Sequence, residues 1–180
     1  HRDEITALLE KLGEAPAEFR IIDADTDAAC AQQAVACVTR GEANFLMKGL
    51  LGTADLMRAV LNRDANLRTG RLLSHVMLYE PQGHKMMLNT DGGMNTFPTL
   101  EQKADILENA AQTLRALGYE KIYAACICGA EVVNPKIPSM LDAQALAGMT
   151  ERWVPYNMEV YGPVGLDLAV SKEACRHKHY

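Results

Sequence analysis

Leu46-Met-Lys-Gly-Leu-Leu-Gly-Thr-Ala-Asp-Leu-Met-Arg58 is the stretch that best indicates how this chain folds. It begins in a short apolar segment, contains two glycines, and continues into residues at helical spacing, which is the pattern of a strand that turns into a helix. The first turn of a helix has free backbone N–H groups and the positive end of the helix dipole, so it attracts anions. The stretch therefore predicts a helix that opens toward a phosphate, although glycines before a helix are also ordinary turn chemistry.

Four residues of this stretch are candidates for binding the anion. Thr53 is expected to cap the helix next to Gly52, while Lys48 and Arg58 add positive charge and hydrogen-bond donors. Residues 44–71 contain five cations and two anions, in a chain whose net charge is −5. This local charge favours a small polyanion, whereas the overall charge argues against a broad surface for nucleic acid.

Strands and helices are predicted to alternate on both sides of this stretch. Before and within it, we expect a helix at 3–12, a strand at 19–22, a helix capped within 23–27 that runs to about 40, a strand at 44–47 and a helix at 54–62. After it, we expect a hairpin of strands 72–80 and 85–89, a helix at 99–117, a strand at 121–127, a helix at 138–147, a strand at 158–161 and short helices within 164–176. This order predicts an α/β fold with a mixed sheet and helices on both faces.

Further polar residues lie at the ends of the predicted strands. Thr69, Arg71 and Ser74 surround the entry to strand 72–80, where their side chains would point into a cleft, or simply be solvated surface groups. Asp91 and Asn95 follow strand 85–89 in a glycine-rich loop, where polar residues often line a ligand site. An Asx turn is the competing explanation for Asp91.

The loop after strand 121–127 holds three more candidates. Glu131 and Asn134 lie just beyond the carboxyl end of this strand, and Lys136 is a further donor for an anion. Solvation of the loop and capping of the next helix explain the same residues equally well. Cys126 and Cys128 lie on one face of the strand, but no second cysteine pair at zinc spacing follows, so they are predicted to be packing residues.

Cysteine usage and hydropathy favour a cytoplasmic protein. The chain has five cysteines, an odd number in mostly apolar surroundings, which suits reduced thiols better than disulfides. No apolar stretch reaches the roughly 20 residues that a membrane span needs. No secretory signal is visible at His1, and this start looks like a cut in a longer chain. Residues 23–27 begin like a calcium loop, but Ala28 stands where that loop needs glycine, so no metal is expected.

Five motifs in order resemble the phosphate acetyl/butyryltransferase family, and within it the phosphate butyryltransferases most. They are Lys48-Gly-Leu-Leu-Gly-Thr-Ala-Asp-Leu-Met-Arg58, Leu67-Arg-Thr-Gly-Arg-Leu-Leu-Ser-His75, Asp91-Gly-Gly-Met-Asn95, Val133-Asn-Pro-Lys-Ile-Pro138 and Tyr161-Gly-Pro-Val-Gly-Leu-Asp167. No single motif decides the matter, but five in sequence rarely arise by chance. The resemblance covers almost everything after about Gly41.

The resemblance implies the two-domain fold of the isocitrate and isopropylmalate dehydrogenases, with an active site in the cleft between the domains. Residues 1–71 would belong to the first α/β domain, and residues 72–180 to the second and to a return toward the first. The activity implied is acyltransfer between coenzyme A and inorganic phosphate, in which Arg58 holds the phosphate. Ser74 is our second candidate for a catalytic residue. Coenzyme A would be a substrate, with no metal or tightly bound cofactor, and the protein would be a homodimer.

The chain also departs from the family pattern. The family normally continues beyond the position of Tyr180, into a segment whose Ser-Arg pair faces the thiol and the acyl carbonyl, and has further strands before Arg2. We therefore expect a chain truncated at both ends, with the residues that activate the thiol outside it. The alternatives are a long-chain phosphate acyltransferase of the same fold and a noncatalytic module that binds acyl-coenzyme A or phosphate. A dehydrogenase of this fold would need an Asp pair at i and i+4 on a helix for a divalent cation, and none is present. Acetyl and butyryl both remain open as the acyl group.

Overall fold

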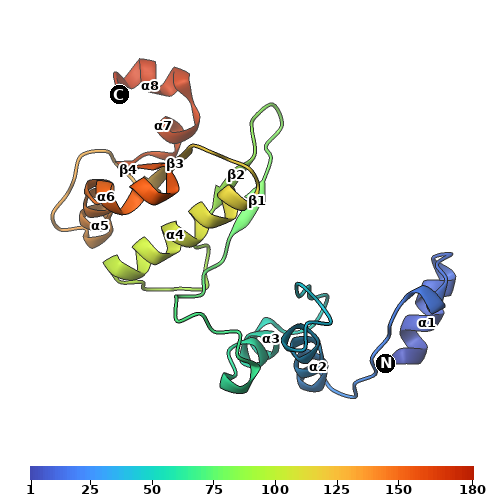
Figure 1. Ribbon diagram of the computed structural model, residues 1–180. Coiled ribbons are helices and arrows are strands. Elements are labelled where there is room, and N and C mark those ends of the chain that lie inside the picture. Colours follow the sequence, from blue (N-terminus) through green and yellow to red (C-terminus); the bar gives the residue numbers. More distant parts are fainter. The chain divides into compact units, whose positions relative to one another are not determined.

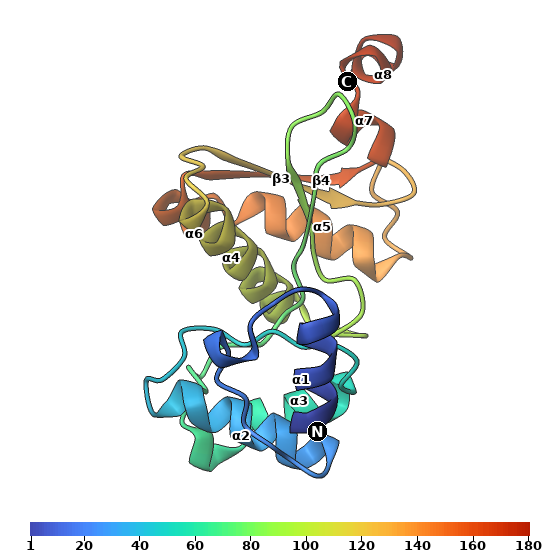
Figure 2. The same cartoon turned by 90° about the vertical axis from the view of Figure 1, so that its right-hand side faces the viewer.

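The computed structural model describes residues 1–180, which separate into two units between Gly70 and Arg71. Figures 1 and 2 show the helices and strands of each unit from two sides. No helix in either unit combines the length and the apolar character needed to cross a bilayer.

Helices provide all the regular structure of the first unit. They are α1 (Arg2–Lys11), α2 (Asp27–Thr39) and α3 (Thr53–Val60), with the 3-10 turns η1 (Pro16–Glu18) and η2 (Arg63–Ala65). The start of α2 is set by Thr26, whose side chain accepts a hydrogen bond from the N–H of Ala29 at 3.1 Å. All three predicted helices of this region are confirmed, with ends that differ by only one or two residues.

Neither of the two strands predicted in the first unit forms. Residues 19–22 and 44–47 pair with no other segment. A strand needs hydrogen bonds to a neighbouring strand, and a short apolar run does not supply that neighbour. Two of the apolar side chains stay in solvent, since Phe45 is 77% and Met47 89% exposed. The prediction was wrong because it inferred a pairing from one segment alone.

A small apolar core joins α2 to α3. Ala31 and Val35 of α2 are buried against Ala59 of α3, and Leu46 and Leu51 pack beside them. Leu46 and Leu51 flank the glycine-containing loop that leads into α3, so this core holds the loop to the two helices.

The second unit contains a parallel pair of strands and a separate antiparallel hairpin. The parallel pair is β3 (Ile122–Ile127) and β4 (Met158–Val164), in which Ile122 is opposite Met158. The hairpin is β1 (Met77–Tyr79) and β2 (Met87–Asn89), and its turn is closed by a hydrogen bond from the N–H of His84 to the carbonyl of Pro81. The predicted strands are confirmed, although those of the hairpin are shorter. The parallel strands and the antiparallel strands form two separate two-stranded sheets, so the single mixed sheet that we predicted is not seen.

Helices account for most of the regular structure of the second unit. They are α4 (Leu100–Ala116), α5 (Pro138–Gly148), α6 (Thr150–Trp153), α7 (Leu166–Val170) and α8 (Lys172–Lys178), with the 3-10 turn η3 (Val154–Tyr156). The long helix α4 begins with a capping box in which Thr99 and Gln102 bond to each other's backbone N–H groups. It ends before Gly118, whose φ of +91° is easily adopted by glycine. The predicted helices of this unit are confirmed.

The main core of the second unit lies between the β3–β4 pair and its helices. Figures 1 and 2 both show α4 and α5 on the same side of these strands. Trp153 is 1% exposed in this core, and its indole N–H donates to the carbonyl of Leu146 at 2.8 Å. Tyr123 lies on the opposite face of β3 and is 61% exposed. The second helical layer that we predicted is therefore not seen over this residue.

Candidate functional site

The loop before α3 is closed on itself by a lysine. The ammonium group of Lys48 lies 3.4 Å from the carbonyl oxygen of Gly49 and 3.3 Å from that of Leu51. The N-cap of α3 is Gly52, and no side chain caps the helix. The prediction that Thr53 caps α3 is therefore wrong, because Thr53 is already the first helical residue and the turn places the N-cap one residue earlier.

Arg58 meets a carboxylate at the start of its own helix. Its Nη1 lies 2.7 Å from Oδ1 of Asp55, and the arginine side chain is 73% exposed. A Cβ atom at Gly52 would lie 3.2 Å from Oδ2 of Asp55, so this carboxylate also borders the helix N-cap. Such an exposed pair contributes little stability, about 0.2–1 kcal/mol. The guanidinium group can therefore exchange Asp55 for another anion at small cost.

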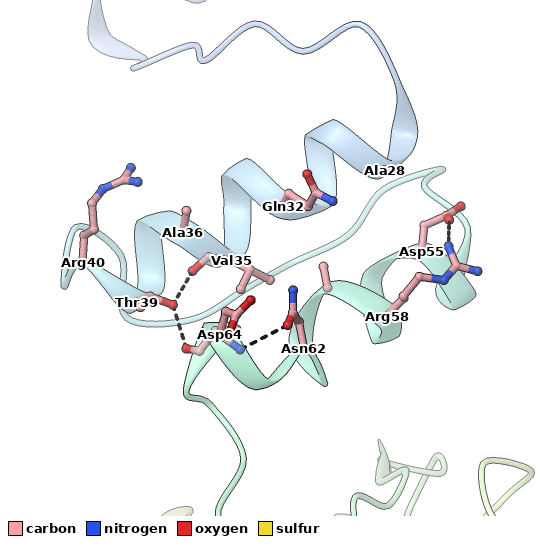
Figure 3. A pocket seen from close by; sticks show the side chains of 12 residues that line it. Ala28, Gln32, Val35, Ala36, Thr39, Arg40, Asp55, Arg58, Asn62 and Asp64 are labelled. Atoms are coloured by element: carbon pink, nitrogen blue, oxygen red, sulfur yellow. Dashed lines mark hydrogen bonds and ion pairs between the residues drawn. The ribbon is translucent and has the colours of Figure 1, made fainter.

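A cavity of about 540 Å³ lies between α2 and α3, with Arg58 and Asp55 at its edge. Figure 3 shows that one face of α2 lines this cavity. Arg40 lies at one end of this face, and Arg58 of α3 lies near the opposite end. Apart from Arg58, the polar and charged lining residues were not selected by sequence reasoning, and they are Gln32, Thr39, Arg40, Asp55, Asn62 and Asp64. The pattern of one helix does not reveal which of its faces remains uncovered, so the sequence contained no signal for them.

The hydroxyl of Thr39 and the side chain of Asn62 hold the walls of this cavity. Thr39 Oγ1 donates to the carbonyls of Val35 at 3.1 Å and Ala65 at 3.0 Å, which links the end of α2 to η2. Asn62 Oδ1 accepts from the N–H of Asp64 at 3.1 Å and caps η2. These residues are structural supports of the cavity in the first unit (Figure 3).

In the second unit, side chains bind the extended segment that contains Ser74. Asn109 of α4 donates to the carbonyl of Leu72 at 2.8 Å and to Oγ of Ser74 at 3.0 Å. Asn95 donates to the carbonyl of Leu73 at 3.0 Å. In a sheet, these backbone carbonyls would accept hydrogen bonds from a neighbouring strand. Here they accept hydrogen bonds from side chains instead, which explains why β1 begins only at Met77.

Asp91 organises the glycine-rich loop that it opens. Its Oδ1 accepts from the N–H groups of Gly93 at 3.2 Å and Met94 at 2.9 Å, so the Asx turn is present. Its Oδ2 accepts from the side chain of Asn95 at 2.5 Å and from the N–H of His75 at 3.4 Å. Burial raises the pKa of Asp91, but these four hydrogen bonds outweigh it and hold the pKa below its usual range. Asp91 is thus an ionised residue that ties the loop to the Ser74 segment.

Arg71 belongs to an ion-pair cluster on α4. Its Nη2 lies 2.6 Å from Oε2 of Glu108, and Oε1 of the same carboxylate lies 2.7 Å from Nε of Arg152. Arg152 also pairs with Glu101 at 2.7 Å and Asp105 at 3.1 Å. The hydrogen bonds that Arg152 donates to Glu108 and Glu101 raise its pKa. Sequence reasoning missed this cluster, although the acidic residues of α4 are spaced one and two turns apart.

The carboxylates of this cluster pair with arginines. No group of three or more His, Cys, Asp or Glu side chains in residues 1–180 is arranged to hold a metal ion. Arg152 occupies the place where the acidic side chains of α4 converge.

The three candidates after β3 lie in one loop. Oδ1 of Asn134 accepts from the N–H of Lys136 at 3.0 Å, which is a turn within the loop, and no side chain caps α5. Glu131 pairs with Lys178 of α8 at 3.3 Å, and Lys178 also pairs with Asp167 at 3.0 Å. The loop is thereby attached to the last helix of the second unit, while Lys136 makes no ion pair and is exposed.

The structure groups the predicted site residues into three sets. Lys48, Gly52, Thr53 and Arg58 lie on one loop and helix of the first unit, and Thr69 lies in the segment after η2 that ends this unit. Asp91 and Asn95 bond to each other and to the backbone of His75 and Leu73, the two neighbours of Ser74, in the second unit that also contains Arg71. Glu131, Asn134 and Lys136 form the third set and make no hydrogen bond to Ser74, Asp91 or Asn95. The roles of all these residues stay predictions.

Comparison with known proteins identifies relatives over nearly the whole chain. The family described as Phosphate acetyl/butaryl transferase matches residues 1–180. A phosphate butyryltransferase of Clostridium acetobutylicum is 40% identical over 177 residues, which cover 98% of this chain and 59% of the relative. A phosphate acetyltransferase of Thermotoga maritima is 37% identical over 98% of this chain and 60% of its own length.

A solved structure agrees with these relatives. The crystal structure of a branched-chain phosphotransacylase from Enterococcus faecalis V583 is similar with a TM-score of 0.83 and 35% identity. The similarity covers 90% of this chain and 58% of that chain. This chain therefore spans about three fifths of the length of the proteins that it matches.

Proposed function

This chain belongs to the phosphate acetyl/butaryl transferase family, and from that premise we propose that it acts in the exchange of a short acyl group between coenzyme A and inorganic phosphate. In the direction that forms the thioester, the coenzyme A sulfur attacks the carbonyl carbon of an acyl phosphate. A C–S bond forms, the C–O bond to phosphate breaks, and inorganic phosphate leaves with the electron pair. The reverse reaction uses phosphate as the nucleophile. This chemistry depends on positioning and on donors for developing negative charge.

The observation that carries this proposal is the exposed guanidinium of Arg58 at the edge of the cavity in the first unit. The guanidinium group has one partner, the carboxylate of Asp55, in an exposed ion pair. An incoming phosphate can replace this carboxylate. Arg58 also ends the motif that begins at Lys48, so the family resemblance and the geometry select the same residue. Arginine suits the role because its planar group binds phosphate oxygens through two parallel N–H bonds.

The second unit would supply polar groups for the thioester side of the reaction. Ser74 is held by Asn109 at 3.0 Å, and Asp91 and Asn95 fix the neighbouring loop. We assign these residues a role in binding and orienting the substrate, because hydrogen bonds within the second unit already order their side chains. Arg71 is bound to Glu108, and this pair would orient any anion that Arg71 contacts.

The wider setting follows from the same family. We propose that the complete fold is the two-domain arrangement of the isocitrate and isopropylmalate dehydrogenases, that residues 1–71 and 72–180 contribute to its two domains, and that the protein is a homodimer. Coenzyme A would bind as a substrate without a resident cofactor. All five cysteines are free thiols, which supports a reducing compartment such as the cytoplasm.

The test is to measure phosphate and coenzyme A binding by isothermal titration calorimetry before and after Arg58→Ala. Loss of a charged hydrogen-bond partner should weaken phosphate binding by about tenfold or more, and coenzyme A binding by less. Arg63→Ala is the matched control, since Arg63 is an exposed arginine of the same unit that does not line the cavity. Equal effects of the two variants would remove Arg58 from the site. Binding of both ligands without any acyl exchange would favour the noncatalytic module.

A further inference from the structure

A second cavity of about 540 Å³ opens at the carboxyl end of β3. One wall is the segment 127–130, which continues β3, and the other is formed by Ile137, Ser139 and Met140 at the start of α5. The N–H of Cys128 donates to the carbonyl of Val164 at 2.9 Å and so fixes the first wall to β4. Volumes of this size are typical of small-molecule sites, and the carboxyl end of a parallel strand is a usual place for them.

The lining of this cavity is apolar and carries no charge. Its only polar side chains are the thiol of Cys128 and the hydroxyl of Ser139. Met140 is 3% exposed, whereas Ile137 is 42% exposed. Partial burial raises the pKa of the Cys128 thiol. A phosphate group would lose its hydration in this cavity without gaining a donor, but a hydrocarbon chain would not.

A polar loop joins the two walls of the cavity. The two walls are joined by residues 131–136, the loop that contains Glu131, Asn134 and Lys136. The N–H of Ile137 donates to the carbonyl of Asn134 at 3.0 Å, and Oδ1 of Asn134 accepts from the N–H of Lys136 at the same distance. The lining of the cavity is apolar, whereas the loop that joins its two walls carries polar and charged residues. This combination fits a ligand that has a polar head and a short hydrocarbon tail.

We propose that this cavity holds the hydrocarbon tail of the short acyl group, with Gly129 and Met140 limiting its length. The inference rests on the proposed acyl exchange and adds to it the place where acyl chain length is measured. Each methylene transferred from water into an apolar site contributes about fourfold in affinity. A butyl group should therefore bind about fifteenfold more tightly than an ethyl group, provided that the cavity accepts both.

Gly129 allows the cavity to be narrowed without disturbing the backbone. Its φ lies outside the left-handed region, and a Cβ atom added there meets no heavy atom within 4 Å. Gly129→Val should therefore fold normally and fill part of the cavity. Gly148→Val is the matched control, because Gly148 also has open space around it but lies at the other end of α5. Met140→Ala tests the opposite change, since it should deepen the cavity.

The readout is protection of Cys128 from a small thiol reagent, methyl methanethiosulfonate, measured by fragment-ion mass spectrometry. Stable alkyl phosphates (ethyl, butyl and hexyl) serve as probes, with inorganic phosphate for comparison. Cys30 is exposed and provides the internal reference. Burial raises the pKa of Cys126 to about 11, so this nearby thiol should react slowly and be distinguishable.

We expect butyl phosphate to protect Cys128 at about one fifteenth of the concentration that ethyl phosphate requires, and inorganic phosphate not to protect it. Gly129→Val should abolish the advantage of butyl over ethyl, Gly148→Val should leave it unchanged, and Met140→Ala should shift the preference toward hexyl. Protection that is independent of chain length, or no protection although calorimetry detects phosphate binding, would overturn the inference and leave the proposed function intact. No binding of phosphate or of any alkyl phosphate would overturn both.

Discussion

Gly162 in β4 is the position at which a single added methyl group should be least tolerated. A Cβ atom there would lie 2.7 Å from Cβ of Cys126, 3.2 Å from Cβ of Ala143 and 3.2 Å from the carbonyl oxygen of Ala143. The first distance is about 0.8 Å shorter than the closest favourable separation of two carbon atoms. All three atoms are held directly by the backbones of β3 and α5, so no side-chain rotation can relieve the contact.

The expected cost of Gly162→Ala follows from this geometry. Overpacking of a filled core typically costs about 1–3 kcal/mol, occasionally more, and the reduced freedom of the unfolded chain returns only about 0.4–1 kcal/mol. Because a strand or a helix must move, we expect the upper part of this range, a net loss of about 2–3 kcal/mol. With a urea dependence of about 1–2 kcal/mol per molar, the unfolding midpoint should fall by about 1–3 M.

Trp153 provides a specific assay for this loss. It is the only tryptophan of the chain and is 1% exposed in the core of the second unit, so its fluorescence in a urea titration reports the unfolding of that unit. Gly148→Ala is the control, since its added Cβ meets nothing within 4 Å and should leave the midpoint unchanged or slightly higher. If Gly162→Ala and Gly148→Ala had the same midpoint, the inferred close packing of β4 against β3 and α5 would be refuted.

Two further predictions concern the charged groups of the candidate sites. Asp55→Asn should free Arg58 and remove a negative charge that repels phosphate. At a separation of about 5 Å in a well-hydrated site, this repulsion is about 1 kcal/mol, so phosphate affinity measured by calorimetry should rise about fivefold. A weaker affinity would show that Asp55 helps to bind the anion. Because the pKa of Asp91 is lowered in the folded protein, its ionised form should contribute stability that is fully present above the ordinary value of 3.8 and is lost as pH falls through the lowered value. Asp91→Asn should therefore destabilise the second unit near neutral pH and show a smaller loss of stability on acidification, and parallel curves of Trp153 fluorescence midpoint against pH for the two proteins would contradict this.

The family motifs and the helices could be predicted from the sequence because both depend on residues that are close together in the chain. Helical hydrogen bonds close within four residues, so apolar spacing, together with the capping residues within 23–27, predicted α2 and α4 nearly to their ends. The alternation of β3, α5 and β4 was readable for the same reason. The motifs around Arg58 and Asp91 predicted which residues are site candidates, and the family match agrees with the enzyme class that those motifs suggested.

Only the tertiary structure decided which extended segments are strands and which partners the charged residues have. Residues 44–47 look like a strand but pair with nothing, because a ladder needs a second segment that no local pattern specifies. Arg71, Asp91 and Ser74 were chosen as open binding groups, yet each has a partner within the second unit. The cavity beside Cys128 depends on how α5 begins next to the end of β3, residues that are separated in the chain. Contacts of this kind are set by packing between distant segments, and the sequence of one segment does not contain them.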